Sequence, residues 1–243
     1  MLGYIEYTQN GEKAYLEKAS RCGARFLVLD MGKGARGMLS SYRAARAAEK
    51  MRALGVRRAV FPVDFPHTAA FLRSGIAPVD PMPLRRALAA QFVKRKFENL
   101  GISNTQAVVA VCGEHMNDEI GQMVRELALS YRYVMLAVRS GGEEFAARLR
   151  RQYGTALILA PSDDQLERAD ALVMFSPRRE LRRENPVLCA LYPGGEERGI
   201  VPISLGERLA GTVADNCAHE QLAAALYGMG IVPAQRLLGE ITC

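Results

Sequence analysis

The sequence contains no tryptophan, only three histidines and no lysine beyond residue 96. None of its apolar runs approaches the ~20 residues that a membrane-spanning helix needs, so we expect no transmembrane segment. The N-terminal stretch MLGYIEYTQNGEK has no basic flank followed by an apolar segment, and it predicts no secretory signal. The five cysteines are odd in number and widely spaced, at positions 22, 112, 189, 217 and 243. Such spacing does not form a disulfide framework, so we expect a cytoplasmic protein.

Several catalytic and metal-binding motifs are also missing. The sequence has no G-x-S-x-G, no H-E-x-x-H and no G-x-x-x-x-G-K-[ST], which argues against serine hydrolases, zinc peptidases and P-loop enzymes. It has no C-x-x-C either. Two isolated pairs, Cys112 with His115 and Cys217 with His219, would have to meet in the fold to hold zinc. We therefore predict no metal site.

The charge is unevenly distributed along the chain. The net charge is +6, but residues 1–100 carry 18 basic against 8 acidic residues, and residues 101–243 carry 14 against 18. A change of sign of this kind indicates a domain boundary or two surfaces with different partners. Because no helix-turn-helix, zinc-finger or RNP pattern accompanies the basic residues, we interpret them as solvated helix faces rather than as a nucleic-acid interface.

Short β-rich apolar runs alternate with helical patterns, which predicts an α/β protein with mainly parallel sheets. We expect two doubly wound lobes joined by a helix, the second lobe being Rossmann-like. The predicted domains are residues 1–83, a linking helix within 84–104, and residues 105–243 including the C-terminal helices. The predicted strands are 2–8, 26–30, 58–62, a short one within 75–83, 107–112, 133–138, 156–160, 171–175, 187–192 and 200–204. The predicted helices are 13–21, 38–54, 68–73, 84–100, 117–130, 143–152, 163–169, 215–228 and 233–241.

A glycine-rich loop lies between a predicted strand and a predicted helix of the first lobe. It consists of Gly32, Lys33, Gly34, Ala35, Arg36 and Gly37 and matches G-x-G-x-x-G. Glycines allow backbone N–H groups to approach a phosphate at a helix N-terminus, and Lys33 and Arg36 would add positive charge. The loop is a candidate site for a substrate anion; the alternative is a solvated basic loop.

Two strand ends of the second lobe carry polar residues. The strand VMLAV is followed by Arg139 and Ser140, and the strand ALVMF by Ser176. An arginine after the second strand of a Rossmann domain pairs with the 2′-phosphate of NADP. Residues 105–177 thereby resemble the NADP-binding half of the shikimate dehydrogenase and glutamyl-tRNA reductase group. The resemblance implies a two-domain reductase with NADP held by Gly113, Arg139, Ser140 and Ser176.

The first turn of the second lobe departs from that family. It reads Cys112-Gly113-Glu114-His115-Met116-Asn117-Asp118-Glu119-Ile120-Gly121, and three carboxylates stand where a diphosphate would dock. Acidic residues at a helix N-terminus stabilise the helix dipole but repel a phosphate. His115, beside carboxylates, is a candidate general acid or base.

Two functional hypotheses remain open from the sequence. The first is a cytosolic NADP-type reductase or dehydrogenase acting on a small anionic molecule. The second is a non-catalytic sensor or interaction protein on a degenerate Rossmann scaffold, binding a nucleotide or no cofactor. A homodimer is compatible with either.

Overall fold

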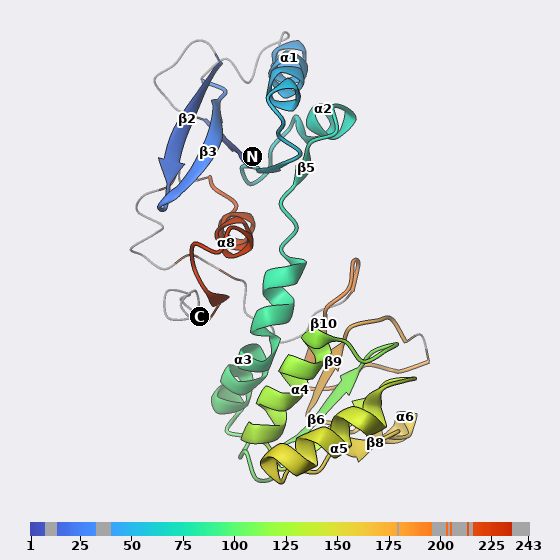
Figure 1. Cartoon of the computed structure of the whole chain (residues 1–243). Helices are drawn as coiled ribbons and strands as arrows, with labels where there is room; N and C mark the ends of the chain where they lie inside the picture. Colours follow the sequence, from blue (N-terminus) through green and yellow to red (C-terminus); the bar gives the residue numbers. More distant parts are fainter. Residues whose placement is uncertain are drawn as a thin grey trace. The chain divides into compact units, whose positions relative to one another are not determined.

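The chain folds into two compact units (Figure 1). The computed structural model describes residues 1–7, 14–32, 40–178, 180–195, 203, 205, 213 and 216–234. Unit 1 comprises Met1–Leu84 and Pro202–Cys243, and unit 2 comprises Arg85–Val201. Each unit is built on a five-stranded, mainly parallel sheet, which confirms the predicted α/β class with two lobes.

Unit 1 has the strand order β2-β3-β1-β4-β5. Strands β1, β3, β4 and β5 run parallel, and β2 is added to β3 in the antiparallel sense. Its elements are β1 (Gly3–Glu6), β2 (Tyr15–Arg21), β3 (Ala24–Asp30), α1 (Ser40–Ala53), β4 (Arg58–Val60), α2 (Thr68–Arg73), β5 (Ala77–Pro78) and α8 (His219–Gly228). Glu6 and Asp30, which pair in the register of β1 and β3, both end at the carboxyl edge of this sheet.

The helix predicted over residues 13–21 is wrong, because Tyr15–Arg21 forms strand β2. The two residues that follow, Cys22 and Gly23, have φ angles of 50° and 79°. Two successive residues with positive φ form the tight turn that joins antiparallel strands with matching twist. The turn therefore folds β2 back onto β3, and pairing with β3 overrides the helical spacing of the segment's apolar residues.

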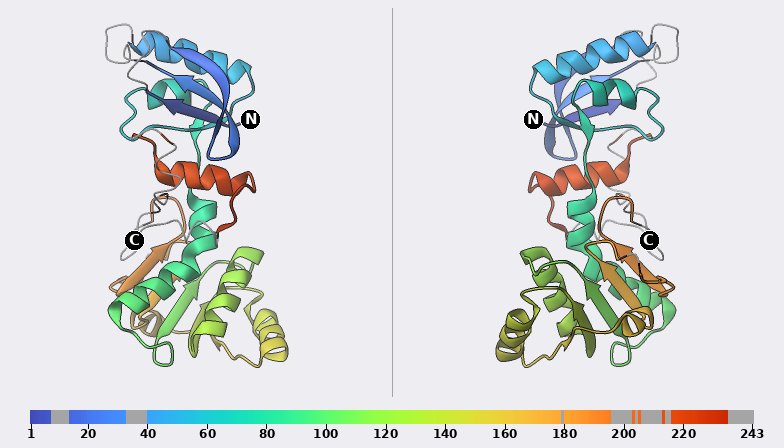
Figure 2. Two further views of the ribbon diagram at one scale, coloured as in Figure 1. Left: turned by 90° about the vertical axis from the view of Figure 1, so that its left-hand side faces the viewer. Right: turned by 90° about the vertical axis from the view of Figure 1, so that its right-hand side faces the viewer.

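Helices cover both faces of the sheet of unit 1. On one face, Leu27 and Leu29 of β3 pack with Ala44 and Met51 of α1 and with Phe71 of α2. The C-terminal helix α8 lies across the sheet from α1, as Figure 2 shows. These two layers make unit 1 doubly wound.

The C-terminal segment belongs to unit 1, whereas we expected it in the second domain. The physical reason is a set of long-range backbone contacts beyond β4. The N–H of Phe61 donates to the side chain of Gln221 at 3.0 Å, and the N–H of Val63 donates to the carbonyl of Asn216 at 2.8 Å. The predicted strand 200–204 and helix 233–241 fall almost wholly outside the described residues.

Unit 2 begins within the linking helix α3, which spans Met82–Leu100 and ends at Gly101 with φ of 67°. This agrees with the predicted helix 84–100 and its terminating glycine. The other elements are β6 (Val108–Cys112), α4 (Asp118–Ser130), β7 (Tyr133–Ala137), α5 (Gly142–Tyr153), β8 (Ile158–Leu159), α6 (Asp163–Glu167), β9 (Ala171–Met174) and β10 (Val187–Ala190).

The sheet of unit 2 is parallel throughout, with the order β10-β9-β6-β7-β8. Counted from the first strand of the unit, this is the order 5-4-1-2-3, which is the order of a Rossmann sheet. Residues such as Ala110 and Cys112 face a core that includes Leu166 of α6, and α4 packs against β6 and β7. In such sheets ligands bind outside the carboxyl ends of the strands, around the point where the strand order reverses. Here that point lies between β6 and β9.

None of the helices in the described part of the chain is long and apolar enough to cross a bilayer.

Candidate functional site

The carboxyl edge of the unit 2 sheet holds four of the predicted site residues within one strand pair. Gly113 follows directly after β6, and its backbone N–H donates to the carbonyl of Ala137 of β7 at 3.1 Å. It is buried, and a Cβ placed on it would lie 2.6 Å from Cδ1 of Ile120. A side chain at this position would therefore displace the end of the Ile120 side chain.

The turn after β6 does not leave the sheet at Gly113 but continues alongside the residues that follow β7. The N–H of Arg139 donates to the carbonyl of Glu114 at 2.9 Å, and the N–H of Met116 donates to that of Ser140 at 3.0 Å. His115 and Ser140 form a parallel bridge. The ladder between β6 and β7 is thereby extended by three residues before α4 begins.

The side chains of His115 and Ser140 meet across this extension. Nδ1 of His115 lies 2.8 Å from Oγ of Ser140, and both residues are exposed. His115, the candidate general acid or base, thus contacts the hydroxyl of Ser140, which we expected to bind a phosphate. A phosphate at Ser140 would have to share or replace this contact.

Arg139 and Ser140 line a hollow of about 440 Å³ over the ends of β7 and β8. The floor is apolar, from Leu136, Val138 and Leu159, and the first turn of α5 supplies Glu143 and Glu144. The N-cap of α5 is Gly141, with φ of 79° and no capping side chain. A volume of a few hundred Å³ with an apolar floor and a few polar groups at the rim is typical of small-molecule sites.

The first turn of α4 carries its own acidic residues. The side chain of Asn117 accepts a hydrogen bond from the N–H of Ile120 at 2.9 Å, so the helix N-terminus is capped internally. Glu119 is bound by Arg86 of α3, with Nη1 3.0 Å from Oε2. Asp118 lines a second hollow between α4 and α5. The expected carboxylates are thus present where a Rossmann diphosphate would dock.

Sequence reasoning missed Arg86, which lies over the carboxyl ends of β9 and β10. Besides Glu119, its guanidinium donates from Nε to the carbonyl of Leu191 at 3.1 Å and stacks 5.9 Å from the ring centre of Phe175. No local motif could have revealed this role, because its partners are 33 to 105 residues away in the sequence.

Ser176 follows the neighbouring strand β9 and is half-buried. It lies on the other side of β6 from Ser140, since β9 and β7 flank β6 and the N–H of Phe175 donates to the carbonyl of Cys112 at 2.8 Å. The two serines therefore stand at the ends of two different strands, and only Ser140 is among the lining residues of the hollow over β7 and β8.

Of the glycine-rich loop 32–37, only Gly32 is among the described residues; Lys33, Gly34, Arg36 and Gly37 lie outside them. Gly32 is buried with φ of 58°, and its N–H donates to Oδ1 of Asp30 at 2.8 Å. This N–H is therefore satisfied by a carboxylate of the chain itself. The substrate-anion role of the loop stays a prediction.

A polar cluster at the carboxyl edge of unit 1 was also missed. Asp30 is fully buried, and Glu6, 6% exposed, accepts a hydrogen bond from Nη2 of Arg21 at 2.7 Å. Hydrogen bonding to Glu6 raises the pKa of the Arg21 guanidinium. The pKa of Tyr15 is raised by desolvation and by the charge of Asp30. The sequence signal was the aspartate that closes the apolar strand FLVLD.

The cysteines of the two weighed zinc pairs belong to different units. Cys112 and His115 lie in unit 2, and Cys217 and His219 in unit 1. Burial raises the pKa of the Cys112 thiol to about 11 and that of the Cys217 thiol to about 11. Both therefore stay protonated at neutral pH, and a thiol is a poor metal ligand. The described residues contain no cluster of three or more side chains that could hold a metal ion.

No protein-family model matches the sequence, and no curated protein matches it. Among solved structures, a mitochondrial ornithine carbamoyltransferase from Coccidioides immitis is 12% identical, with 99% of this chain and 85% of that chain aligned at a TM-score of 0.36. The aspartate transcarbamoylase of Trypanosoma cruzi, in complex with carbamoyl aspartate and phosphate, is 11% identical (100% and 83%, TM-score 0.35).

A third solved structure is the L-tryptophan dehydrogenase of Nostoc punctiforme, which is 12% identical over 86% of this chain at a TM-score of 0.31. This chain spans 57% of that enzyme. Similarities this weak support no argument about the fold, which is assigned from the strand order alone.

Proposed function

We propose that this chain is a nucleotide-binding sensor or interaction protein on a Rossmann-type scaffold, with the ligand in the hollow over β7 and β8. The single observation that carries the proposal is the extended pairing of the β6–α4 turn with the residues after β7. It leaves the hollow beside Arg139 open, while the turn itself presents carboxylates in place of a glycine-lined phosphate cradle.

The ligand class follows from the groups around the hollow. Arg139 offers charge-assisted hydrogen bonds to a phosphate, Ser140 adds a hydroxyl, and the carboxylates of Glu143 and Glu144 can accept hydrogen bonds from ribose hydroxyls. Leu136, Val138 and Leu159 offer apolar surface for a ring or a ribose face. The phosphorylated adenosine end of NADP has these features, with its 2′-phosphate at Arg139. A diphosphate reaching toward α4 would meet Asp118, whose charge repels it.

The second candidate is an NADP-type reductase or dehydrogenase acting on a small anionic molecule. It is favoured by the Rossmann strand order together with Gly113, Arg139 and Ser140 at the ends of adjacent strands. In that case His115 would transfer the proton, Ser176 would contact the cofactor at the end of β9, and the loop 32–37 would hold the substrate anion.

Calorimetric titration with adenosine 2′,5′-bisphosphate, NADPH and NADH separates the two candidates. The first predicts that the bisphosphate binds and that NADPH binds no more tightly, because its diphosphate gains no contact at α4. The second predicts that NADPH binds at least about tenfold more tightly than the bisphosphate, a difference of about 1.4 kcal/mol. Absence of binding by all three ligands contradicts both.

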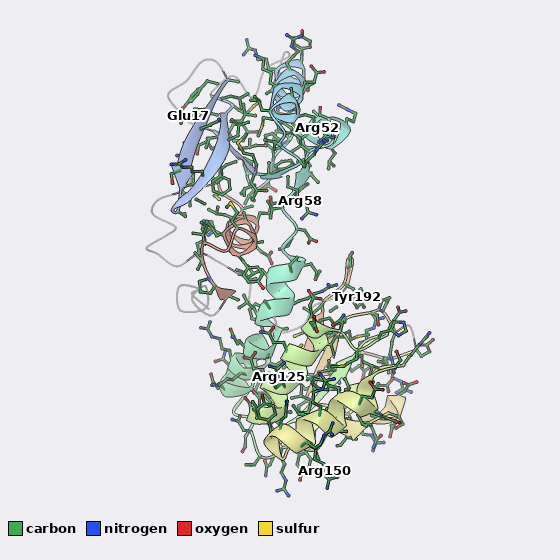
Figure 3. All side chains as sticks on the ribbon, viewed as in Figure 1. Glu17, Arg52, Arg58, Arg125, Arg150 and Tyr192 are labelled. Carbon is green, nitrogen blue, oxygen red and sulfur yellow. The ribbon has the colours of Figure 1, made fainter. Side chains whose placement is uncertain are left out.

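An Arg139→Asp variant locates the site. We expect it to abolish binding of the bisphosphate, because it replaces the cation at the hollow with a carboxylate. Arg150→Asp is the matched control: it makes the same charge change on α5, and Figure 3 shows Arg150 projecting away from the sheet. Equal loss in both variants, or in neither, would refute the assigned role of Arg139.

A further inference from the structure

A groove runs between α4 and α5 on the outer side of unit 2, and its first part adjoins the turns that follow β6 and β7. Two hollows of about 540 and 350 Å³ form it, and both are lined by Arg125, Phe145 and Arg148. Small-molecule sites have volumes of about this size. The nucleotide site proposed above makes no use of these three residues.

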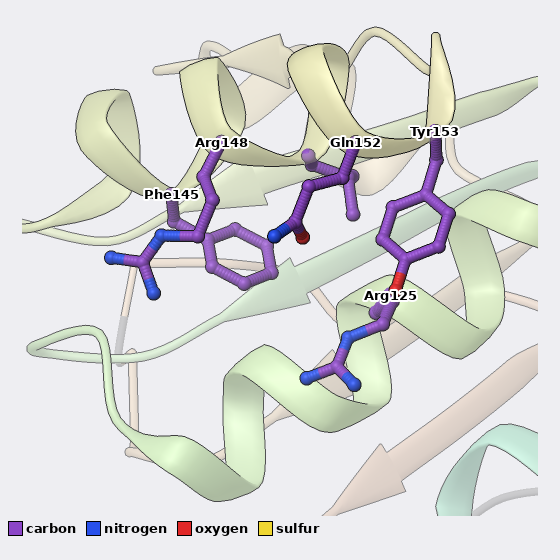
Figure 4. Close-up of a pocket in the computed structure, with 6 residues that line it drawn as sticks. Arg125, Phe145, Arg148, Gln152 and Tyr153 are labelled. Carbon is purple, nitrogen blue, oxygen red and sulfur yellow. The ribbon is translucent and has the colours of Figure 1, made fainter.

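The groove begins where the two helices touch. At Gly121 of α4 an added Cβ would lie 3.3 Å from Cε2 of Phe145 and 3.5 Å from Cε of Met116. Because glycine lets Phe145 approach there, one edge of the ring rests on α4, and the residue is half-buried. Further along the helices, the facing residues Arg125, Gln152 and Tyr153 are all exposed, and the groove opens (Figure 4).

The smaller hollow is cationic. Its six lining residues are Arg125, Phe145, Arg148, Leu149, Gln152 and Tyr153, which include two guanidinium groups and no carboxylate. Within the described part of the chain, neither Arg125 nor Arg148 forms an ion pair or a hydrogen bond. The carboxylates of Asp118 and Glu144 line the larger hollow, toward the helix N-termini, and do not line the smaller one. Two unpaired positive charges on one hollow attract an anion.

The remaining lining groups define what else the ligand carries. Phe145 and Tyr153 present aromatic rings, and Gln152 presents an amide between the two arginines in the view of Figure 4. Aromatic rings stack on one another and on guanidinium planes, and an arginine binds a phosphate or carboxylate with two parallel hydrogen bonds. We propose that the groove between α4 and α5 binds a planar aromatic molecule that carries a phosphate or carboxylate group.

Phenyl phosphate is a direct probe, with inorganic phosphate and phenol as its two halves. Calorimetric titration of the full chain is expected to give saturable binding of phenyl phosphate at millimolar or lower concentration. Each half is expected to bind at least about tenfold more weakly, because it lacks either the ring or the charge. Absence of saturable phenyl phosphate binding, or binding of inorganic phosphate with equal affinity, overturns the proposal.

Single variants test the assignment to the groove. Arg125→Gln and Arg148→Gln are each expected to weaken phenyl phosphate binding about tenfold. Arg150→Gln, which removes the same charge from α5, is expected to leave binding unchanged. All three residues are exposed, so these variants are expected to fold, which circular dichroism checks. Equal affinity in the Arg125→Gln, Arg148→Gln and Arg150→Gln variants contradicts the site.

The same variants distinguish ligand binding in the groove from nucleotide binding in the hollow over β7 and β8. Arg139→Asp is expected to leave phenyl phosphate binding unchanged, and Arg125→Gln to leave adenosine 2′,5′-bisphosphate binding unchanged. If the bisphosphate instead responds to Arg125→Gln and not to Arg139→Asp, the nucleotide lies in the groove and the proposed hollow is wrong.

Discussion

Both sheets carry polar side chains at the carboxyl edge, but these side chains are buried in unit 1 and exposed in unit 2. At the carboxyl edge of unit 1, Asp30 is fully buried and Glu6 is 6% exposed, and both have partners within the chain. At the carboxyl edge of unit 2, His115, Arg139 and Ser140 are exposed beside a hollow of about 440 Å³. A buried carboxylate that is already hydrogen-bonded serves the fold, whereas exposed donors around a hollow are available to a ligand.

Arg86 adds a second contrast, this time within unit 2. It holds Glu119, the carbonyl of Leu191 and the ring of Phe175 at the ends of β9 and β10. The guanidinium of Arg86 is therefore engaged by groups of the chain itself, while the side chain of Arg139 at the hollow over β7 and β8 forms no ion pair or hydrogen bond within the described part of the chain. We take this as support for a nucleotide site that is displaced from the strand reversal toward β8.

The largest expected effect is on the stability of unit 1. Asp30→Ala removes the acceptor of the buried Gly32 N–H, and an unsatisfied buried donor costs about 1 to 3 kcal/mol in the free energy of unfolding. Ser140→Ala, at the corresponding edge of unit 2, removes an exposed hydroxyl and is expected to change that free energy by no more than about 0.5 kcal/mol. Urea denaturation measures the free energy of unfolding of both variants. Equal losses in the two would contradict the contrast between a buried polar edge in unit 1 and an exposed one in unit 2.

A second effect, common to both units, is expected at alkaline pH. The folded state holds the pKa of the buried Cys112 thiol at about 11 against an ordinary value of 9.0, so the folded state keeps a proton that the unfolded state loses. Stability is therefore complete below pH 9 and falls as the pH rises toward 11, by at most about 1.4 kcal/mol per pH unit for this thiol. Burial also raises the pKa of the Cys217 thiol in unit 1 to about 11, so its contribution to stability falls with rising pH in the same way.

Urea titrations at several pH values between 8 and 11 measure this loss. Cys112→Ala is expected to make the decline with pH shallower, because one of the protons retained by the folded state is gone. A decline that is equally steep in wild type and Cys112→Ala would show that this thiol ionises alike in both states.

The sequence predicted those parts of the fold that depend on local patterns. The apolar runs AVVAVC and YVMLAV became β6 and β7, so Gly113, Arg139 and Ser140 were correctly placed beyond strand ends. Strand β2 was missed because its apolar residues have helical spacing, and the turn at Cys22 and Gly23 folds the segment back onto β3.

The remaining features depend on contacts between distant residues. The hydrogen bond from Phe61 to Gln221 spans 160 residues and brings α8 back to unit 1, which no local pattern can reveal. The meeting of His115 and Ser140 depends on how far the turn after β6 stays paired with β7, and that is a property of the folded backbone. The groove between α4 and α5 likewise arises from helix packing at Gly121.

Hydrogen exchange with and without saturating adenosine 2′,5′-bisphosphate tests the central claim most directly, because it reports the binding position along the whole chain. We predict slower exchange in residues 138–144 and 159–160, around the hollow over β7 and β8, with the helix faces of residues 125 and 148–153 unchanged. Protection confined to those helix faces, protection confined to unit 1, or no protection at all would contradict a nucleotide site at this edge of the sheet.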